Sequence, residues 1–350
     1  MNLKYHKNLD GVRAIAALLV MYLHYFNEIP IDTQTLKLFF LSAKLGQTGV
    51  TLFFVLSGFL ITRILLHSDT NKSYFKNFYI RRSLRIFPLY YLFLAIDNFL
   101  SPLIFQQPVQ PWSERFYYYV YLQNFAITFD WSNHGPGHFW SLAVEEHFYL
   151  VWPFILYFFR HRITPNLVIF ATTAVCVLRY IILKEGIEIE LLTFTRIDSL
   201  MIGGMLAFLE RDNYLAKQNR GKFFAAAMIS SLIAIFLLIF YNNEGDLIYQ
   251  MLKHSIWSVA FFSIIALLII SEDQNLINKI LSSKFFSYTG KISYGLYVYH
   301  LLIYQMIHHF LSFEFWIIDM IVCFSSTYLM ASISYHLFEI WFLRKKKAFE

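Results

Sequence analysis

The 350-residue chain has little charge, almost no cysteine and no internal repeat. Charged residues make up 15% of it, whereas about 25% is usual in soluble domains, and this excludes an ordinary soluble fold. The two cysteines, Cys176 and Cys323, lie inside apolar runs, so the sequence indicates neither a disulfide framework nor a metal cluster. The missing repeat counts against a transporter built from symmetry-related halves.

The chain is instead rich in hydrophobic and aromatic residues. The hydrophobic set accounts for 57% of the residues and the aromatic set for 20%, including 38 Phe and 24 Tyr. A soluble protein of this length has no interior large enough to bury them, so we expect an all-α integral membrane protein folded as a single bundle. The net charge of +6 does not indicate a nucleic-acid partner, because membrane proteins keep Lys and Arg in their cytoplasmic loops.

The length of the apolar runs predicts how often the chain crosses the bilayer. A bilayer core about 30 Å thick requires about 20 apolar residues per helix. This length predicts about ten transmembrane helices and no appended soluble domain, so that residues 1–350 form one membrane domain. The sixth helix is short and contains Gly203 and Gly204, so we expect it to be tilted or shielded by protein. The predicted helices span roughly residues 10–28, 47–66, 83–103, 141–159, 166–184, 196–211, 222–241, 254–271, 287–311 and 315–342.

The positions of the basic residues predict the orientation. Most of the 29 Lys and Arg residues fall on one side when the predicted loops are assigned alternately to the two faces. Because basic residues are retained in the cytoplasm, both termini are predicted to be cytoplasmic. The first apolar run lacks a small-residue cleavage site, so we expect no cleaved signal peptide.

Titratable residues inside the predicted helices are candidates for function, because an unpaired charge in the bilayer is costly. In the first helix, Asp10 and Arg13 lie at the predicted cytoplasmic end. His24 follows Asp10 by about 21 Å along the helix axis, which places it in the outer half. There an imidazole can act as a general base toward an attacking hydroxyl group. The alternative is a polar histidine at a helix end, bonded to a carbonyl group or to headgroup water.

Two further helices begin with titratable residues at the predicted outer side. Glu145 and Glu146 are adjacent in the fourth helix, so their side chains diverge by about 100° and cannot both face one pocket. Headgroup solvation near the helix N-terminus is the alternative role for this pair. Gly-Pro-Gly separates His134 from His138 and precludes a regular helix face, so we expect no metal there. The residues that we expect to line an outer substrate pocket are His138, Trp140, Glu146, Arg196 and Asp198.

On the cytoplasmic side, the third helix carries Arg82 and Arg85 on one face. Two guanidinium groups on one face suit bidentate binding of phosphate, and an anchor to anionic lipid is the alternative. His300 lies near mid-depth in the ninth helix. The sequence leaves open whether His300 packs in the bundle or belongs to the substrate pocket.

Several short motifs follow one another along nearly the whole chain: Leu9-Asp-Gly-Val-Arg13 with His24, Phe53-Phe-Val-Leu-Ser-Gly-Phe59, Arg82-x-x-Arg85, His138-Phe-Trp-Ser-Leu-Ala-Val-Glu-Glu146, Arg196-Ile-Asp198 and Ser293-Tyr-Gly-Leu-Tyr-Val-Tyr-His300. Their order resembles that of the acyltransferase 3 family, the membrane O-acyltransferases that modify bacterial surface polysaccharides. Each motif alone is weak, and together they are highly specific. One departure is His147, where relatives commonly carry Gln.

The resemblance implies transfer of an acyl group, usually acetyl from acetyl-coenzyme A, to a carbohydrate hydroxyl group. It implies that Arg82 and Arg85 bind the donor, acetyl-coenzyme A. We expect no metal cofactor. His24 becomes the general base, with Arg13 as its partner and Glu145 as the acidic residue of the Trp-Ser-Leu motif. The residues that we assign to catalysis on this basis are His24, Glu145, Arg13 and Asp10.

The predicted orientation fits this activity. Acyl-coenzyme A is anionic and cytoplasmic, which suits the inner arginines, whereas an acceptor of O-antigen, exopolysaccharide or peptidoglycan type is external. We therefore expect a multi-pass protein of the bacterial cytoplasmic (inner) membrane. Direct transfer and an acyl-enzyme intermediate both remain open. A transporter or flippase of a lipid-linked glycan is the rival interpretation.

Overall fold

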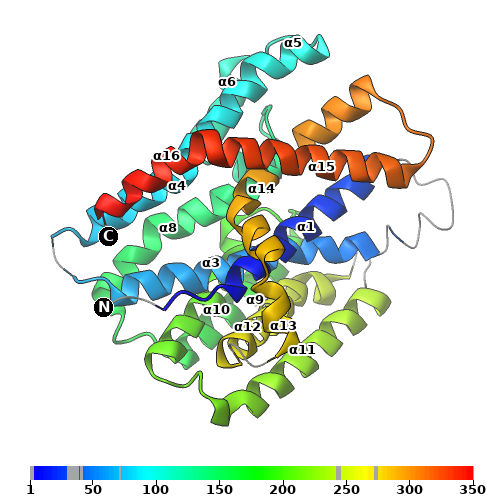
Figure 1. Cartoon of the computed structure of the whole chain (residues 1–350). Coiled ribbons are helices and arrows are strands. Elements are labelled where there is room, and N and C mark those ends of the chain that lie inside the picture. Colours follow the sequence, from blue (N-terminus) through cyan, green and yellow to red (C-terminus); the bar gives the residue numbers. More distant parts are fainter. Residues whose placement is uncertain are drawn as a thin grey trace. The chain divides into compact units, whose positions relative to one another are not determined.

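The computed structural model describes residues 4–29, 39, 42–70, 72–241, 246–271 and 275–349. Every regular element in these ranges is helical, and no strand occurs among them (Figure 1). The all-α prediction is therefore confirmed for this part of the chain. The predicted cytoplasmic termini fall on residues 1–3 and 350, which lie outside the described residues.

The chain divides into two compact units, each assembled from separate stretches of sequence. The first unit comprises residues 1–9, 50–70 and 116–280. The second unit comprises residues 10–49, 71–115 and 281–350. That residues 1–350 form a single membrane domain stays a prediction.

The first unit is built around one deeply buried helix, α10 (Thr193–Arg211), against which α8, α9 and α12 pack. Most of its side chains from Thr193 to Phe208 are buried, so the expected shielding of this short helix by protein is confirmed. The other helices of the unit are α3 (Gln47–His67), α7 (Gln123–Thr128), η3 (Gly137–Phe139), α8 (Trp140–Phe159), α9 (Pro165–Lys184), η4 (Lys217–Asn219), α11 (Arg220–Phe240), α12 (Leu247–Ile270) and α13 (Leu276–Leu281), whereas α6 (Trp112–Tyr119) spans the boundary between the units.

Glycines allow α3 and α10 to approach at backbone contact. A Cβ atom on Gly58 would lie 1.9 Å from the Leu200 carbonyl oxygen, and one on Gly203 would lie 1.9 Å from the Val55 oxygen. Any larger residue at either position would separate the two helices, which is the physical reason for small residues at membrane helix contacts. This contact holds α10, and with it Arg196 and Asp198, against α3.

The second unit is built on a helical pair, α14 (Lys284–Phe310) and α15 (Trp316–Ser334), which pack against each other. Ser283 caps α14 by accepting a hydrogen bond from the Phe286 amide at 3.5 Å, which explains where this helix begins. The other elements of the unit are α1 (Asn8–Glu28, from Asp10 onward), η1 (Lys44–Gly46), α4 (Tyr74–Ala95), the π-helix η2 (Ile96–Leu100), α5 (Ser101–Phe105), the π-helix η5 (Tyr335–Glu339), α16 (Ile340–Lys345) and η6 (Lys346–Phe349).

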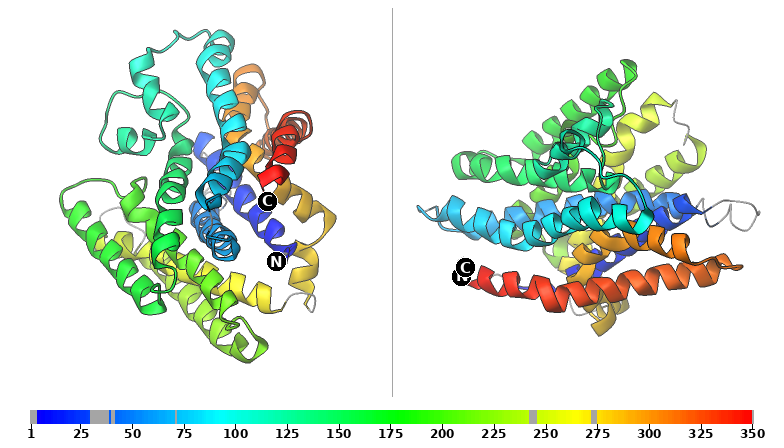
Figure 2. Two further views of the ribbon diagram at one scale, coloured as in Figure 1. Left: turned by 90° about the vertical axis from the view of Figure 1, so that its left-hand side faces the viewer. Right: turned by 90° about the horizontal axis from the view of Figure 1, so that it is seen from above.

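The two π-helical segments lengthen their helices without breaking them. Figure 2 shows α15 continuing through η5 into α16 toward the C-terminal end. Helix α4 packs against α14, η5 and α16. Helices α1 and α14 also approach closely, since a Cβ atom on Gly290 would lie 2.0 Å from the Asp10 carbonyl oxygen. These contacts bring α1, α4 and α14, which carry most of the predicted catalytic and donor-binding residues, into one unit.

Among the described residues, eight helices are long and apolar enough to cross a membrane. They include α1, α8, α9 and α12, and the continuous stretches Tyr74–Phe105 and Trp316–Lys345. Each of the ten predicted spans coincides with a helix, but α10 and α14 fall outside the eight because α10 carries several charges and α14 is rich in Tyr and His. A multi-pass membrane protein is thus established, whereas ten crossings and the orientation stay predictions.

Candidate active site

Two histidines of the second unit face each other where α1 meets α14. Nδ1 of His24 lies 2.7 Å from Nε2 of His300, and the two rings are stacked with centroids 4.9 Å apart. His300 is fully buried, whereas His24 is half-buried. The sequence left the role of His300 open, and the structure makes it a direct hydrogen-bond partner of the predicted base.

The hydrogen bonds of this pair fix which nitrogen carries each proton. A backbone carbonyl only accepts, so Nδ1 of His300, 2.7 Å from the Tyr297 oxygen, is protonated. In a neutral imidazole the other nitrogen is then an acceptor, and Nε2 of His300 accepts a hydrogen bond from Nδ1–H of His24. The lone pair of His24 therefore lies on Nε2. A histidine held in one tautomer with a lone pair directed away from its partner can act as a general base.

The opposite end of α1 carries a buried ion pair. Nη1 of Arg13 donates to Oδ1 of Asp10 at 2.6 Å, and Asp10 is almost fully buried. One helical turn separates the two residues, so the pair is local to α1. This contact explains how both charges are accommodated in the helix, and it links the two first-helix residues assigned to catalysis to each other. It does not bring them to His24, which lies about 21 Å further along the helix.

Arg85 belongs to the same end of the second unit as the Asp10–Arg13 pair. Arg85 and Asp10 both interact electrostatically with Tyr335. Arg85 also interacts with Glu339, which is buried in the π-helix η5 and accepts a hydrogen bond from Ser334 at 3.3 Å. Within this unit, Arg85 and Asp10 thus share the neighbour Tyr335, whereas His24 lies near the other end of α1, and the roles of these residues stay predictions.

Arg82 and Arg85 themselves lie on α4, three residues apart and both half-buried. This spacing puts the two side chains on neighbouring positions of one helix face. A half-buried guanidinium is well suited to bind phosphate, because it is less hydrated than an ammonium group and presents a planar pair of donors. The arrangement fits binding of a phosphate group, and the role in donor binding stays a prediction.

In the first unit, Arg196 lies within a network of charged and aromatic groups. Nη1 of Arg196 lies 2.6 Å from Nδ1 of His254 and 3.4 Å from a Glu190 oxygen. Its guanidinium carbon lies 5.5 Å from the ring centroids of both Phe54 and Trp140. These cation–π contacts account for the burial of a charged residue at only 2% exposure. Two predicted pocket residues, Arg196 and Trp140, are thus neighbours.

Glu190 precedes α10 and lies outside the membrane helices. It forms ion pairs with Lys253, with His254 at 3.0 Å and with Arg196 at 3.4 Å. Burial opposes the charge of the Glu190 carboxyl group, but the neighbouring His254, Lys253 and Arg196 outweigh burial and hold its pKa well below the usual range. Glu190 therefore stays ionised and balances the positive charges at this end of α10.

The Asp198 carboxylate is buried in the core, where Arg179 balances its charge. Its Oδ1 accepts from Nη2 of Arg179 at 2.6 Å, and its Oδ2 accepts from Ser255 at 2.6 Å. Arg179 also donates to the Thr195 carbonyl oxygen at 2.7 Å, and both charged side chains are inaccessible to solvent. These bonds join α9, α10 and α12 and give Asp198 a stabilising function. A role for Asp198 in a substrate pocket stays a prediction.

The remaining residues of the fourth-helix motif lie in α8 and just before it. His138 is buried in η3 against the Phe139 ring, with centroids 4.8 Å apart, whereas Glu145 and Glu146 are both half-buried in α8. Nδ1 of His147, which departs from the family pattern, lies 2.7 Å from the Thr193 hydroxyl group at the start of α10. The described contacts therefore connect this motif to α10 within the first unit.

Several charged groups were missed by the sequence analysis, among them Glu190, Glu339 and Arg63. Glu339 lies in the last predicted helix, and its charge in an apolar run was a signal that could have identified it. Arg63 forms two hydrogen bonds to the Glu210 carboxylate, at 2.5 and 2.8 Å, and Nε2 of His6 lies 3.2 Å from its Nη2. No local signal pairs Arg63 with Glu210, because α3 and α10 are far apart in sequence.

Comparisons with known proteins identify what the chain is similar to. The sequence matches the acyltransferase-domain model of the acyltransferase 3 family over residues 6–335. It is 30% identical over 325 residues to a Listeria monocytogenes serovar 1/2a protein named peptidoglycan O-acetyltransferase OatA, covering 85% of this chain and 49% of that protein. It is 27% identical over 372 residues to a Staphylococcus aureus strain NCTC 8325 protein named O-acetyltransferase OatA, covering 99% of this chain and 58% of that protein.

The chain thus spans about half the length of these curated relatives. No solved structure matches it. The match covers both compact units, from residue 6 before α1 to residue 335 at the start of η5.

Proposed function

Because this chain belongs to the acyltransferase 3 family, we propose that it transfers an acyl group, acetyl by preference, from acyl-coenzyme A to a carbohydrate hydroxyl group. The observation that carries the proposal is the His24–His300 pair, in which the lone pair of His24 lies on Nε2. The carbohydrate is of peptidoglycan type, because one relative is named for peptidoglycan O-acetylation. Acceptors of O-antigen or exopolysaccharide type are the alternatives that the assay below compares.

The proposed reaction is a direct transfer with His24 as general base. Nε2 of His24 removes the proton from the acceptor hydroxyl group as its oxygen attacks the thioester carbonyl carbon. The carbon–sulfur bond then breaks, and the imidazolium returns the proton to the leaving thiolate. The products are the O-acyl ester and free coenzyme A. General-base assistance contributes about 10²–10⁴-fold, and positioning of the two substrates supplies more.

We propose the membrane orientation together with the reaction. Ten crossings with both termini in the cytoplasm place Arg82 and Arg85 at the inner face and His24 in the outer half. Phosphates of coenzyme A then bind at the arginines, and the pantetheine arm extends along the bundle toward His24. The supporting observation is that Arg85 shares a neighbour, Tyr335, with Asp10 at the far end of α1 from His24. Localisation in the bacterial cytoplasmic membrane follows from this assignment.

Purified protein in detergent or nanodiscs provides the test of the function. We expect release of free thiol from acetyl-coenzyme A that depends on an added glycan fragment, with acetyl ester detected on the fragment by mass spectrometry. Peptidoglycan, O-antigen and exopolysaccharide fragments are compared as acceptors. Binding and translocation of a glycan without thioester cleavage would instead support the transporter interpretation and overturn the proposal.

Replacing either donor arginine is expected to weaken donor binding. A hydrogen bond to a charged group contributes about 1.5–3 kcal/mol, so Arg82→Ala and Arg85→Ala should each raise the KM for acetyl-coenzyme A by roughly 10- to 100-fold. The KM for the glycan should change little. Lys76→Ala is the matched control, because Lys76 is an exposed basic residue on the opposite face of α4. If the KM for acetyl-coenzyme A is the same in all three variants, Arg82 and Arg85 do not bind the donor, and anchoring to anionic lipid is their remaining role.

Replacing His300 is expected to lower the rate without changing substrate binding. His300→Ala removes the acceptor that fixes the His24 tautomer, so kcat should fall on the order of 10- to 100-fold, a part of the general-base contribution. A glutamine at this position retains an acceptor oxygen, so His300→Gln should recover part of the loss. If alanine and glutamine reduce kcat equally while thermal stability is unchanged, the hydrogen bond to His24 does not support catalysis.

A further inference from the structure

A second cluster of reactive side chains lies in the second unit, away from the His24–His300 pair. His308 from the last turns of α14, and Asp319 and Cys323 from α15, bring their donor atoms within 4.8 Å of one another. Asp319 and Cys323 are four residues apart on α15 and therefore share one helix face. The α14–α15 pairing adds His308 from the facing helix. A nitrogen, an oxygen and a sulfur donor thus converge on one point.

The distances between these donors are close to those of a metal-bound set. Nε2 of His308 lies 3.0 Å from Oδ2 of Asp319 and 3.8 Å from Sγ of Cys323. Sγ of Cys323 lies 3.8 Å from Oδ1 of Asp319. Around a tetrahedral Zn²⁺ ion, ligands bound at about 2.0–2.3 Å are separated by roughly 3.3–3.6 Å. The carboxylate approaches His308 through Oδ2 and Cys323 through Oδ1, and the three ligand atoms lie within 4.8 Å of one another, so binding through both oxygens or a shift of about an ångström would bring all three residues onto one ion.

The charges of the three groups balance those of a divalent ion. A Cys323 thiolate and an Asp319 carboxylate carry two negative charges, and a neutral His308 carries none. With one divalent cation the set is neutral, which suits a site whose cysteine is fully buried and whose aspartate is 7% exposed. The His308 side chain remains 28% exposed and offers a path by which an ion can enter.

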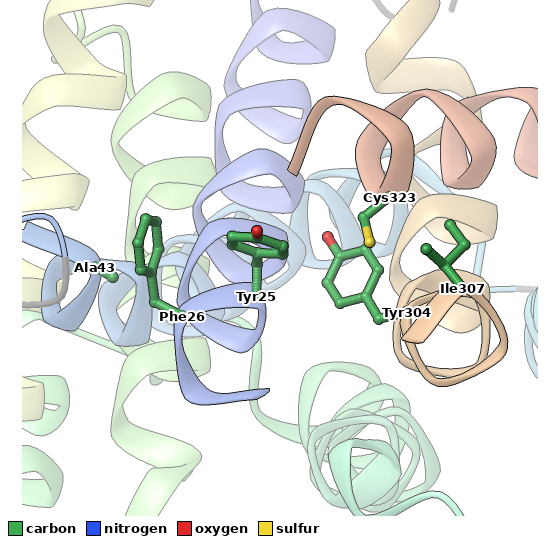
Figure 3. Packing of buried hydrophobic residues seen from close by; sticks show 6 residues of the cluster. All are labelled: Tyr25, Phe26, Ala43, Tyr304, Ile307 and Cys323. Atoms are coloured by element: carbon green, nitrogen blue, oxygen red, sulfur yellow. The ribbon is translucent and has the colours of Figure 1, made fainter. Parts of the chain in front are cut away.

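Surrounding groups hold the carboxylate in place. The hydroxyl group of Tyr25 on α1 lies 2.8 Å from Oδ2 of Asp319 and 2.7 Å from the Trp316 carbonyl oxygen. Figure 3 shows Tyr25, Tyr304 and Cys323 together in the buried cluster at this position, with the sulfur beside the Tyr304 ring. Hydrogen bonds to a ligating carboxylate orient it, and an apolar wall excludes competing water.

We propose that His308, Asp319 and Cys323 bind one divalent transition-metal ion, Zn²⁺ by preference, with a water molecule as the fourth ligand. Thiolate and imidazole donors favour Zn²⁺ over Mg²⁺ or Ca²⁺, which require oxygen ligands. The ion fastens the end of α14 to α15, and through the bond between Asp319 and Tyr25 it fixes the adjoining part of α1. The open fourth position takes water that enters past the partly exposed His308 side chain, and the proposed role of the ion is to stabilise the helix packing and not to take part in acyl transfer.

Cobalt provides the probe for this site, because a thiolate bound to Co²⁺ gives an intense near-ultraviolet charge-transfer band. Full-length protein is purified in detergent, freed of metal with a chelator and titrated with Co²⁺. We expect the thiolate band to saturate at about one ion per chain, with visible bands of tetrahedral intensity. Addition of Zn²⁺ should abolish both. Absence of the thiolate band at excess Co²⁺ would overturn the proposal and leave a hydrogen-bonded Tyr25–Asp319–His308 network.

The two cysteines of the chain supply a matched pair of variants. Cys176→Ser should keep the band, because Cys176 lies 3.3 Å from Ser255 in the first unit, whereas Cys323→Ser should lose it. His308→Gln alters a partly exposed side chain and is therefore the mildest variant of the site. It should weaken Co²⁺ binding at least about tenfold. A band that persists in Cys323→Ser, or full affinity in His308→Gln, would contradict the assigned ligands.

Discussion

His24→Ala is expected to lower kcat for acyl transfer by about 10²–10⁴-fold, the contribution of a general base. The variant removes Nε2 of His24, the nitrogen assigned as the base. In the variant, Nε2 of His300 loses its donor, but His300 is fully buried, so we expect it to be a poor substitute for His24. The loss is measured as thiol release from acetyl-coenzyme A and as acetyl ester on the glycan.

A control on the same helix separates chemistry from folding. Asn27 is exposed, one turn beyond His24 on α1, so Asn27→Ala should retain the activity of the unmodified protein. In cells that depend on the protein for glycan acetylation, His24→Ala should abolish the acetyl signal in NMR spectra. Full acetylation at normal protein level would exclude His24 as the base.

Asp198→Ala is expected to lower the free energy of unfolding by about 3–5 kcal/mol, because it leaves the Arg179 guanidinium buried and uncompensated. Both side chains of this ion pair are inaccessible to solvent. The Asp198 carboxylate also accepts from Ser255 at 2.6 Å, so three helices lose a common contact. Unfolding by SDS in mixed micelles measures the change.

Two further variants test whether the unpaired charge is the cause. The double variant Arg179→Met with Asp198→Asn removes both charges, so it should be considerably more stable than Asp198→Ala alone. Asp212→Ala is the control for a solvent-accessible ion pair, because Asp212 and Arg211 are 58% and 37% exposed and such pairs contribute little. If Asp198→Ala and Asp212→Ala have equal effects, the buried pair does not stabilise the bundle.

The sequence alone determined the class of the protein and the positions of its helices. Apolar length is a local property, so each of the ten predicted spans coincides with a helix, and Gly203 marked a short helix that protein shields. The motifs around His24, Arg82 and Arg196 likewise indicated the acyltransferase 3 family, which the match over residues 6–335 confirmed. The sequence also placed Asp10 and Arg13 at one end of the first helix, and the structure shows that these residues, three apart, form an ion pair.

Partners distant in sequence were decided by the tertiary structure. His24 and His300 lie 276 residues apart, and no local pattern predicts that their rings meet. The same holds for Arg179, which meets Asp198 only because α9 packs on α10. It also holds for Cys323, which the sequence placed in an apolar run and which the pairing of α14 with α15 sets beside His308. Periodicity fixes which face a residue occupies, whereas only the packing of one helix on another decides what that face meets.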